Sequence, residues 1–134
     1  MSGQDNTQLV QQAYANFKNG DIPTLLTLFA DDIEWELDET ENVPFTGARH
    51  GKDQVAKFFD ELSEEQHALQ FDPQEFVAQN DRVVALGHYA WSVNSTDRTY
   101  ESDWAHVFTI RNGKISRFRE FFDTAAGAAA YQKS

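Results

Sequence analysis

The sequence predicts an α+β fold with helices near its start and a curved, largely antiparallel sheet towards its end. Apolar residues recur at helical spacing in most of the first 62 residues, whereas residues 69–122 alternate apolar and polar side chains, as strands do. Short turn sequences separate the later strands, most clearly Asn112-Gly113, which suits the two positive φ angles of a tight hairpin. One domain over residues 1–134, with the sheet wrapped around its helices, accounts for this order.

The chain begins with two helices. Asp5 and Gln8 resemble a capping box that opens the first helix, and Gly20 ends it. The buried face of this helix is a stripe of apolar side chains at helical spacing: Leu9, Val10, Ala13, Tyr14 and Phe17. Asp21 caps the second helix, and Pro23 stands in its first turn, where a missing backbone N–H costs nothing.

A strand and a third helix follow. Residues 32–37 alternate apolar residues with acids, which indicates a strand with one face in water. A loop that contains Pro44, Gly47 and Gly51 leads to a helix over residues 52–62. The apolar stripe of this helix includes two adjacent phenylalanines, which predicts that it packs against the core.

Only strands follow, before a short helical tail with the sequence TAAGAAAY. Pro73 lies within the strand 69–78, which places that strand at an edge of the sheet or beside a bulge. Gly87 lies within the strand 82–93 and indicates a bulge or a bend there. The last two strands form the hairpin 104–123.

The composition excludes several classes of protein. A formal net charge of −11 argues against nucleic acid as a partner, because phosphates require a basic surface. There is no cysteine, and the four histidines lack metal-ligand spacing, so we expect neither a metal nor another cofactor. No apolar run of about 18 residues is present, and the first residues do not resemble a signal peptide. We therefore expect a cytoplasmic protein that does not act at a membrane.

The final hairpin carries two ionisable groups, His106 and Glu120, in apolar surroundings. Strand alternation puts them on faces that are otherwise apolar and aromatic: Trp104, Phe108, Phe118 and Phe122. A carboxyl group walled by aromatic rings loses hydration, which disfavours its anion, so Glu120 is suited to exchange protons near neutral pH. His106 can donate a hydrogen bond to a developing enolate oxygen. Alternatively, the two form a structural hydrogen bond, or they face outwards and Glu120 lies in water.

Other aromatic residues and histidines are candidates for the wall of a pocket. Tyr14 is either a core tyrosine or a site residue. Trp35 fits the lining of a hydrophobic cavity, and Trp91 stays ambiguous because a bulge would shift the register of its strand. His50 borders the mouth of a pocket or is a plain surface residue, and His88 faces a pocket or a dimer interface.

Three stretches carry a resemblance to a known family: KNGDIPTLLTLFADDIEWEL (18–37), GARHGKDQVAKFFDEL (47–62) and the closing hairpin. Together with the order of elements, they resemble the nuclear-transport-factor-2-like (NTF2-like) superfamily, and within it the SnoaL-like, ketosteroid-isomerase-related proteins. The resemblance implies a cone-shaped, cystatin-like fold in which a curved mixed sheet wraps around the N-terminal helices. It also implies one deep apolar pocket, and a homodimer formed through the outer face of the sheet.

The resemblance further implies roles for individual residues. SnoaL-like cyclases carry a histidine at the position of His106 and an acid–base aspartate at that of Glu120. Ketosteroid isomerases carry their general base near the position of Leu37, so steroid-type isomerisation is not expected. The Asp–Arg–Asp set of limonene-type epoxide hydrolases has no counterpart between residues 104 and 108.

Two functions remain open. The first is a cofactor-independent cyclase, isomerase or dehydratase acting on a small, mostly apolar carbonyl compound, with Glu120 as acid and base and His106 as oxyanion partner. The second is a non-catalytic module that binds an apolar metabolite. Both require a pocket of about a few hundred Å³. Both also fit a homodimer, because apolar residues such as Val107 and Phe121 occupy the opposite face of the sheet.

Overall fold

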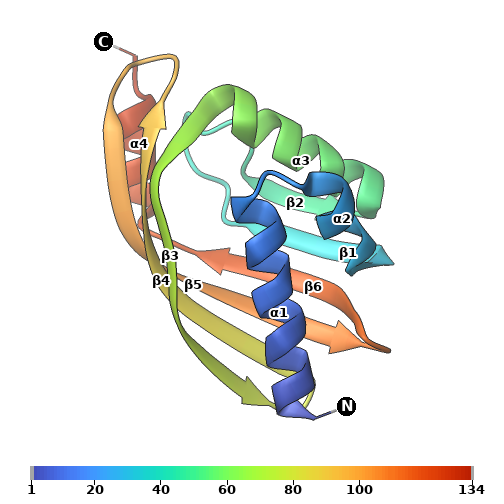
Figure 1. The fold of residues 1–134 in the computed structure, drawn as a ribbon. Coiled ribbons are helices and arrows are strands. Elements are labelled where there is room, and N and C mark those ends of the chain that lie inside the picture. Colours follow the sequence, from blue (N-terminus) through green and yellow to red (C-terminus); the bar gives the residue numbers. More distant parts are fainter. Residues whose placement is uncertain (1, 134) are drawn as a thin grey trace.

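The computed structural model describes residues 2–133 of the chain. Four helices and six strands follow one another in this range: α1 (Gly3–Lys18), α2 (Ile22–Thr27), β1 (Phe29–Leu37), β2 (Gly47–His50), α3 (Lys52–Glu65), β3 (Gln66–Gln79), β4 (Arg82–Val93), β5 (Thr99–Arg111), β6 (Lys114–Phe121) and α4 (Thr124–Tyr131). Figure 1 shows a strongly curved sheet with α1, α2 and α3 over its concave face. None of the helices between residues 2 and 133 has the length and apolar character needed to cross a membrane.

The sheet is mixed, with the strand order β2-β1-β6-β5-β4-β3. β1 runs parallel to β6, and every other pair of neighbouring strands is antiparallel. The predicted α+β class, with a curved mixed sheet around N-terminal helices, is therefore confirmed.

Two details near the start of the chain differ from the prediction. The capping box of α1 is formed by Ser2 and Asp5. The predicted pair of Asp5 and Gln8 placed the start of the helix too late, because serine and aspartate both suit the N-cap position and the sequence offers both. The predicted loop before α3 contains β2, which pairs with β1. This strand has only four residues, too few to show a period of two in the sequence.

Gly87 lies at an irregularity, as the sequence predicts. Gly87 pairs with Pro73, and the register of the edge strand β3 against β4 shifts between Pro73 and Glu75, whereas β4 pairs with β5 without a break. Gly87 also has a second role. A Cβ atom on Gly87 would lie 2.3 Å from Trp104 Cζ2 and 2.5 Å from the Asp72 carbonyl oxygen. Gly87 is therefore required so that the Trp104 indole can lie flat against the sheet, and this indole supports the site described below.

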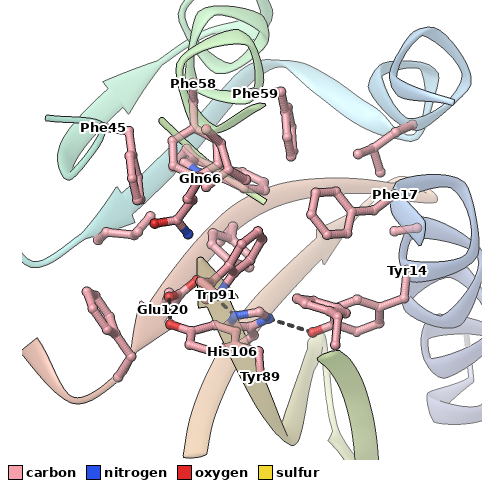
Figure 2. A pocket seen from close by; sticks show the side chains of 18 of the residues that line it. Tyr14, Phe17, Phe45, Phe58, Phe59, Gln66, Tyr89, Trp91, His106 and Glu120 are labelled. Atoms are coloured by element: carbon pink, nitrogen blue, oxygen red, sulfur yellow. Dashed lines mark hydrogen bonds and ion pairs between the residues drawn. The ribbon is translucent and has the colours of Figure 1, made fainter. Parts of the chain in front are cut away.

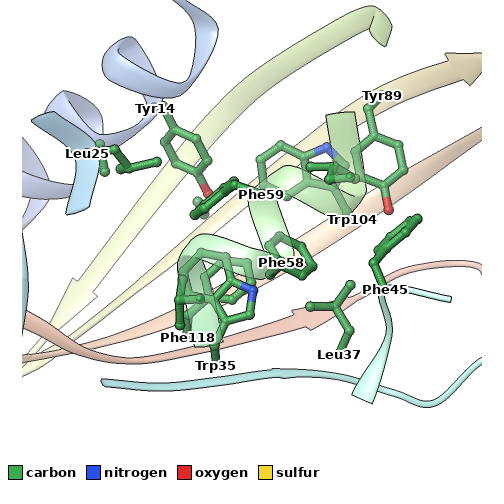
Figure 3. Close-up of a cluster of buried hydrophobic side chains, with 14 of the residues drawn as sticks. Tyr14, Leu25, Trp35, Leu37, Phe45, Phe58, Phe59, Tyr89, Trp104 and Phe118 are labelled. Carbon is green, nitrogen blue, oxygen red and sulfur yellow. The ribbon is translucent and has the colours of Figure 1, made fainter. Parts of the chain in front are cut away.

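Aromatic side chains fill most of the space between the sheet and its helices (Figure 3). Trp35 of β1 stacks on Phe118 of β6, with ring centroids 3.8 Å apart. Phe58 and Phe59 of α3 each lie 5.4 Å from the Trp35 ring. These contacts fix α3 over the concave face, so that side chains pointing inwards from the sheet meet a wall of rings.

The convex face carries a row of apolar side chains across three strands. Leu86 is paired with Ala105, and Ala105 with Phe121. Leu86 is 38% exposed and Phe121 is 45% exposed. Exposed apolar residues that line up on one sheet face commonly mark an interaction surface. We therefore still expect a second copy of the chain to cover this row.

Gly87→Ala should lower the free energy of unfolding by about 1 to 3 kcal/mol, the usual cost of overpacking a core, as measured by urea denaturation. Trp104→Phe removes the second ring that the new methyl group would meet. In that background the Gly87→Ala substitution should cost less, because the two sites are coupled. An equal cost in both backgrounds would assign the strain to the Asp72 carbonyl instead.

Analytical ultracentrifugation at micromolar concentration should show a dimer, because an isologous contact would bury the apolar row. Phe121→Lys should convert the dimer to a monomer by placing a charge in that contact. Leu69→Lys is the matched control, since Leu69 is 57% exposed but lies outside the row, and this variant should remain dimeric. A wild-type protein that sediments as a monomer contradicts the expected interface.

Candidate functional site

The β5–β6 hairpin brings His106 and Glu120 together. The two residues are directly opposite in the antiparallel register, and Asn112 and Gly113 at the turn take φ angles of 52° and 75°. His106 Nε2 lies 3.0 Å from Glu120 Oε1, and the two side chains are 5% and 12% exposed. The face that they share is therefore the inner one.

Two tyrosines extend this pair into a chain of hydrogen bonds. The Tyr14 hydroxyl oxygen of α1 lies 2.7 Å from His106 Nδ1, and the Tyr89 hydroxyl of β4 donates to Glu120 Oε2 at 2.7 Å. Figure 2 shows the four side chains converging at one side of the interior. One helix and three strands thus meet at a single polar cluster.

The protonation of the tyrosines sets the direction of these bonds. Burial, reinforced by the negative charge of Glu120, raises the pKa of Tyr14 well above its ordinary value, and the same causes raise the pKa of Tyr89. Both hydroxyl groups keep their protons and donate. Tyr14 donates to His106 Nδ1, so the network assigns the ring proton to Nε2, which donates to Glu120. Both nitrogens of His106 are engaged, and each oxygen of Glu120 accepts one hydrogen bond.

Aromatic rings fix the orientation of His106. The Trp104 indole stacks on the imidazole, with ring centroids 4.0 Å apart and planes inclined by 19°. Phe118 packs against it with its ring centroid 4.7 Å away. His106 is 4% exposed, so the imidazole is held in place by packing as well as by its two hydrogen bonds.

Beside this cluster lies a cavity of about 70 Å³. His106 and Glu120 line it, together with most of the aromatic residues that the sequence assigned to a pocket wall: Tyr14, Trp35, Trp91, Phe108, Phe118 and Phe122. The volume is smaller than the few hundred Å³ expected, because aromatic rings pack across the space. A cavity of this volume has room for only a few water molecules.

A wider groove of about 620 Å³ lies outside this cavity, between the ends of α1 and α3 and the start of β3. The groove and the cavity share a wall of mainly aromatic side chains: Phe17, Phe59, Leu62, Gln66, Phe71 and Trp91. These shared residues therefore lie between the cavity and the groove.

Some predicted site residues lie elsewhere. Trp104 does not line the cavity but stacks behind His106. His50 bonds to Glu34 in an exposed position. His88 lies on the convex face, where its hydrogen bond to Asp103 raises its pKa. Among residues 2–133, no three histidine, cysteine or acidic side chains are grouped so as to hold a metal ion.

Sequence reasoning missed several residues of the cavity wall, among them three polar residues: Gln66, Tyr89 and Tyr100. A signal for Tyr89 was present, because strand alternation puts it on the same face as Trp91. Gln66 gave no signal, since α3 continues to Glu65, beyond its predicted end. Gln66 is a single polar residue at the junction of helix and strand.

Comparison with known proteins places this site in a family. Residues 10–118 match the SnoaL-like domain family. The match covers most of the sequence, so the chain belongs to the SnoaL-like proteins of the NTF2-like superfamily, and the resemblance read from the sequence is confirmed. No curated protein sequence matches the chain.

Solved structures share the fold over nearly the whole chain. An NTF2-like protein from Burkholderia xenovorans LB400 is 37% identical with a TM-score of 0.90, and the alignment covers 98% of this chain and 99% of that one. An NTF2-like protein from Burkholderia thailandensis E264 is 28% identical with a TM-score of 0.88, over 99% and 100% of the two chains. TerC, co-crystallized with polyporic acid, is 26% identical with a TM-score of 0.84, over 96% and 99%.

Tyr14→Phe should lower the free energy of unfolding by about 1 to 3 kcal/mol, because it leaves the buried Nδ1 of His106 without a donor. Urea denaturation measures this loss. In a His106→Phe background the Tyr14→Phe substitution should cost clearly less, since its partner is already absent. The same cost in both backgrounds would show that the hydrogen bond does not stabilise the fold.

Proposed function

We propose that the protein is a cofactor-independent enzyme that moves a proton on a small, mostly apolar carbonyl compound, in the manner of a cyclase, an isomerase or a dehydratase. The observation that carries this proposal is the Glu120 carboxylate on the wall of an aromatic cavity, oriented by His106 and Tyr89. An oriented carboxylate in apolar surroundings is suited to act as a general base.

The proposed step begins with an α-hydrogen of the carbonyl compound beside Glu120. The carboxylate takes the proton, the electron pair of the broken C–H bond moves towards the carbonyl, and an enolate forms. The carboxylic acid then returns the proton to the same or another carbon. Each carboxylate oxygen accepts one hydrogen bond from the protein, which leaves further lone pairs for this transfer. Only a proton and bonding electrons of the substrate move, so no cofactor is needed.

The hydrogen bonds of His106 favour a part different from the oxyanion role expected from the sequence. Its Nδ1 accepts from Tyr14 and its Nε2 donates to Glu120, so no N–H of the ring is left for a substrate oxygen. We therefore assign His106 as a positioning residue, which orients the Glu120 carboxylate and stabilises its charge.

Related proteins support a small-molecule substrate. TerC, at 26% identity, was co-crystallized with polyporic acid. A more distant structure from Mesorhizobium loti, at 18% identity, carries the name of a SnoaL-like polyketide cyclase, and at that distance it supports the shared fold alone. The residues of this chain, more than the names of its relatives, favour proton transfer.

A non-catalytic binding module is the second candidate. The fully hydrogen-bonded state of His106 and the small cavity favour it, because a merely structural polar cluster has the same features. Under this alternative the aromatic wall opens to hold an apolar metabolite, and nothing is converted.

The Glu120→Gln substitution distinguishes the proposed enzyme from the binding module. The enzyme should accelerate exchange of the α-hydrogens of a compact ketone such as 2-indanone for deuterium in heavy water, measured by NMR. The substitution should slow this exchange by a factor of about 10² to 10⁴, the usual contribution of a general base. Binding of the ketone, measured by tryptophan fluorescence, should change little.

Glu64→Gln is the matched control, because Glu64 is exposed on α3, and this variant should exchange at the wild-type rate. Wild-type protein that binds a series of small enolisable ketones without accelerating exchange in any of them contradicts the enzyme and supports the binding module.

A further inference from the structure

A hydrogen-bond donor without an acceptor faces the cavity from the junction of α3 and β3. Gln66 is 3% exposed and lines the cavity. In Figure 2 its amide nitrogen is turned towards the space above Trp91 and Glu120. No protein group between residues 2 and 133 accepts a hydrogen bond from this nitrogen, whereas the amide oxygen has two partners.

Two tyrosines hold the amide in this orientation. The hydroxyl groups of Tyr100 and Tyr131 donate to Gln66 Oε1 at 3.0 Å and 2.6 Å. Burial raises the pKa of both hydroxyl groups, so both remain donors. Because the amide oxygen is held by two donors, the NH₂ group is left for the cavity. The Gln66 backbone N–H also bonds to the Leu62 carbonyl, which gives the side chain a rigid support.

Trp35 supplies a second unpaired donor at the same end of the interior. Trp35 is 6% exposed, and its Nε1 has no acceptor between residues 2 and 133. Figure 3 shows the indole nitrogen on the side of the ring that faces Phe45. Phe58 packs against both Trp35 and Phe45, at 5.4 Å and 5.9 Å between ring centroids. Phe45 in turn packs against Tyr131, which holds the Gln66 amide.

This end of the cavity therefore offers the Gln66 N–H group, and the Trp35 Nε1 is buried close by without contact with the open space. The charged acceptor in the cavity is the Glu120 carboxylate, which lines another part of the cavity wall. Tyr100, which holds Gln66, packs against Tyr89 with ring centroids 6.4 Å apart, and Tyr89 bonds to Glu120, so the two parts of the wall are linked by two neighbouring side chains. A ligand that fits both must present an acceptor atom at one position and an acidic hydrogen at another.

We propose that Gln66 binds the oxygen atom of the substrate: its cavity-facing N–H donates to the carbonyl oxygen of a compact, enolisable compound whose α-carbon faces Glu120. This inference rests on the proposed function and adds the group that His106 cannot supply. As the α-proton leaves, negative charge develops on the carbonyl oxygen, and a preoriented donor stabilises it.

A pair of probes isolates the contribution of the oxygen. 2-Indanone and indane have the same carbon skeleton and differ in the carbonyl group, so the ratio of their affinities, measured by tryptophan fluorescence, reports on recognition of the oxygen. Gln66→Glu keeps an oxygen for Tyr100 and Tyr131 but turns an acceptor towards the cavity. Gln66→Met removes both polar groups at similar volume. Each should reduce the ratio by about tenfold, as expected when a buried donor is lost.

Gln11→Met is the matched control, because Gln11 is exposed on α1 and does not line the cavity. It makes the same change of side chain away from the site, so the ratio should stay near the wild-type value. Circular dichroism identifies which variants are folded. An unchanged ratio in a folded Gln66→Glu or Gln66→Met variant overturns the proposal, and so does wild-type protein that binds 2-indanone no more tightly than Gln66→Met does.

Deuterium exchange separates this inference from the proposed function. If exchange depends on Glu120 but the affinity ratio does not depend on Gln66, the proposed enzyme activity is supported and the proposed oxygen-binding role of Gln66 is wrong. If the wild type catalyses no exchange but the ratio falls in both Gln66 variants, Gln66 binds the ligand oxygen in a protein that is not an enzyme.

Discussion

The register of β5 against β6 is the constraint on which the interior of this protein depends. It places His106 opposite Glu120, inside a chamber of aromatic rings where water cannot satisfy either group. Tyr14 and Tyr89 satisfy them from α1 and β4, so the bonds that neutralise the cost of burial also tie these elements to the hairpin. A slip of one residue would turn a strand's inward side chains outwards and break this network.

The same hydrogen bonds determine which polar groups remain available to a ligand. His106 uses both ring nitrogens to hold Glu120 and Tyr14, and Gln66 uses its oxygen to satisfy Tyr100 and Tyr131. What remains is a carboxylate with lone pairs on one part of the wall and an amide N–H on another. The proposed ligand, which carries an acidic hydrogen and an acceptor oxygen, complements these two groups.

Dense aromatic packing gives the chamber its low polarity and also limits its size. A cavity of about 70 Å³ is small for a site in a fold whose relative TerC was co-crystallized with polyporic acid. The rings shared with the outer groove, among them Phe17 and Phe71, lie 5.1 Å apart between centroids and belong to α1 and β3. Because that wall is made of side chains rather than backbone, it can open without breaking the sheet.

The sequence by itself determined most of the elements and the inward face of the hairpin, because local periodicity, Asn112-Gly113 and the cap at Asp21 act over a few residues. It also pointed to His106 and Glu120, since a polar residue alone among aromatics is visible in a strand pattern. Only the tertiary structure decided the hydrogen-bond partners of His106, the position of Trp104 behind it, and the presence of Gln66 in the cavity wall. These three features depend on contacts with Tyr14, Gly87 and Tyr131. Each of these residues is distant along the chain from its partner and contacts it only when the sheet curves around its helices, so no local sequence pattern predicts the contact.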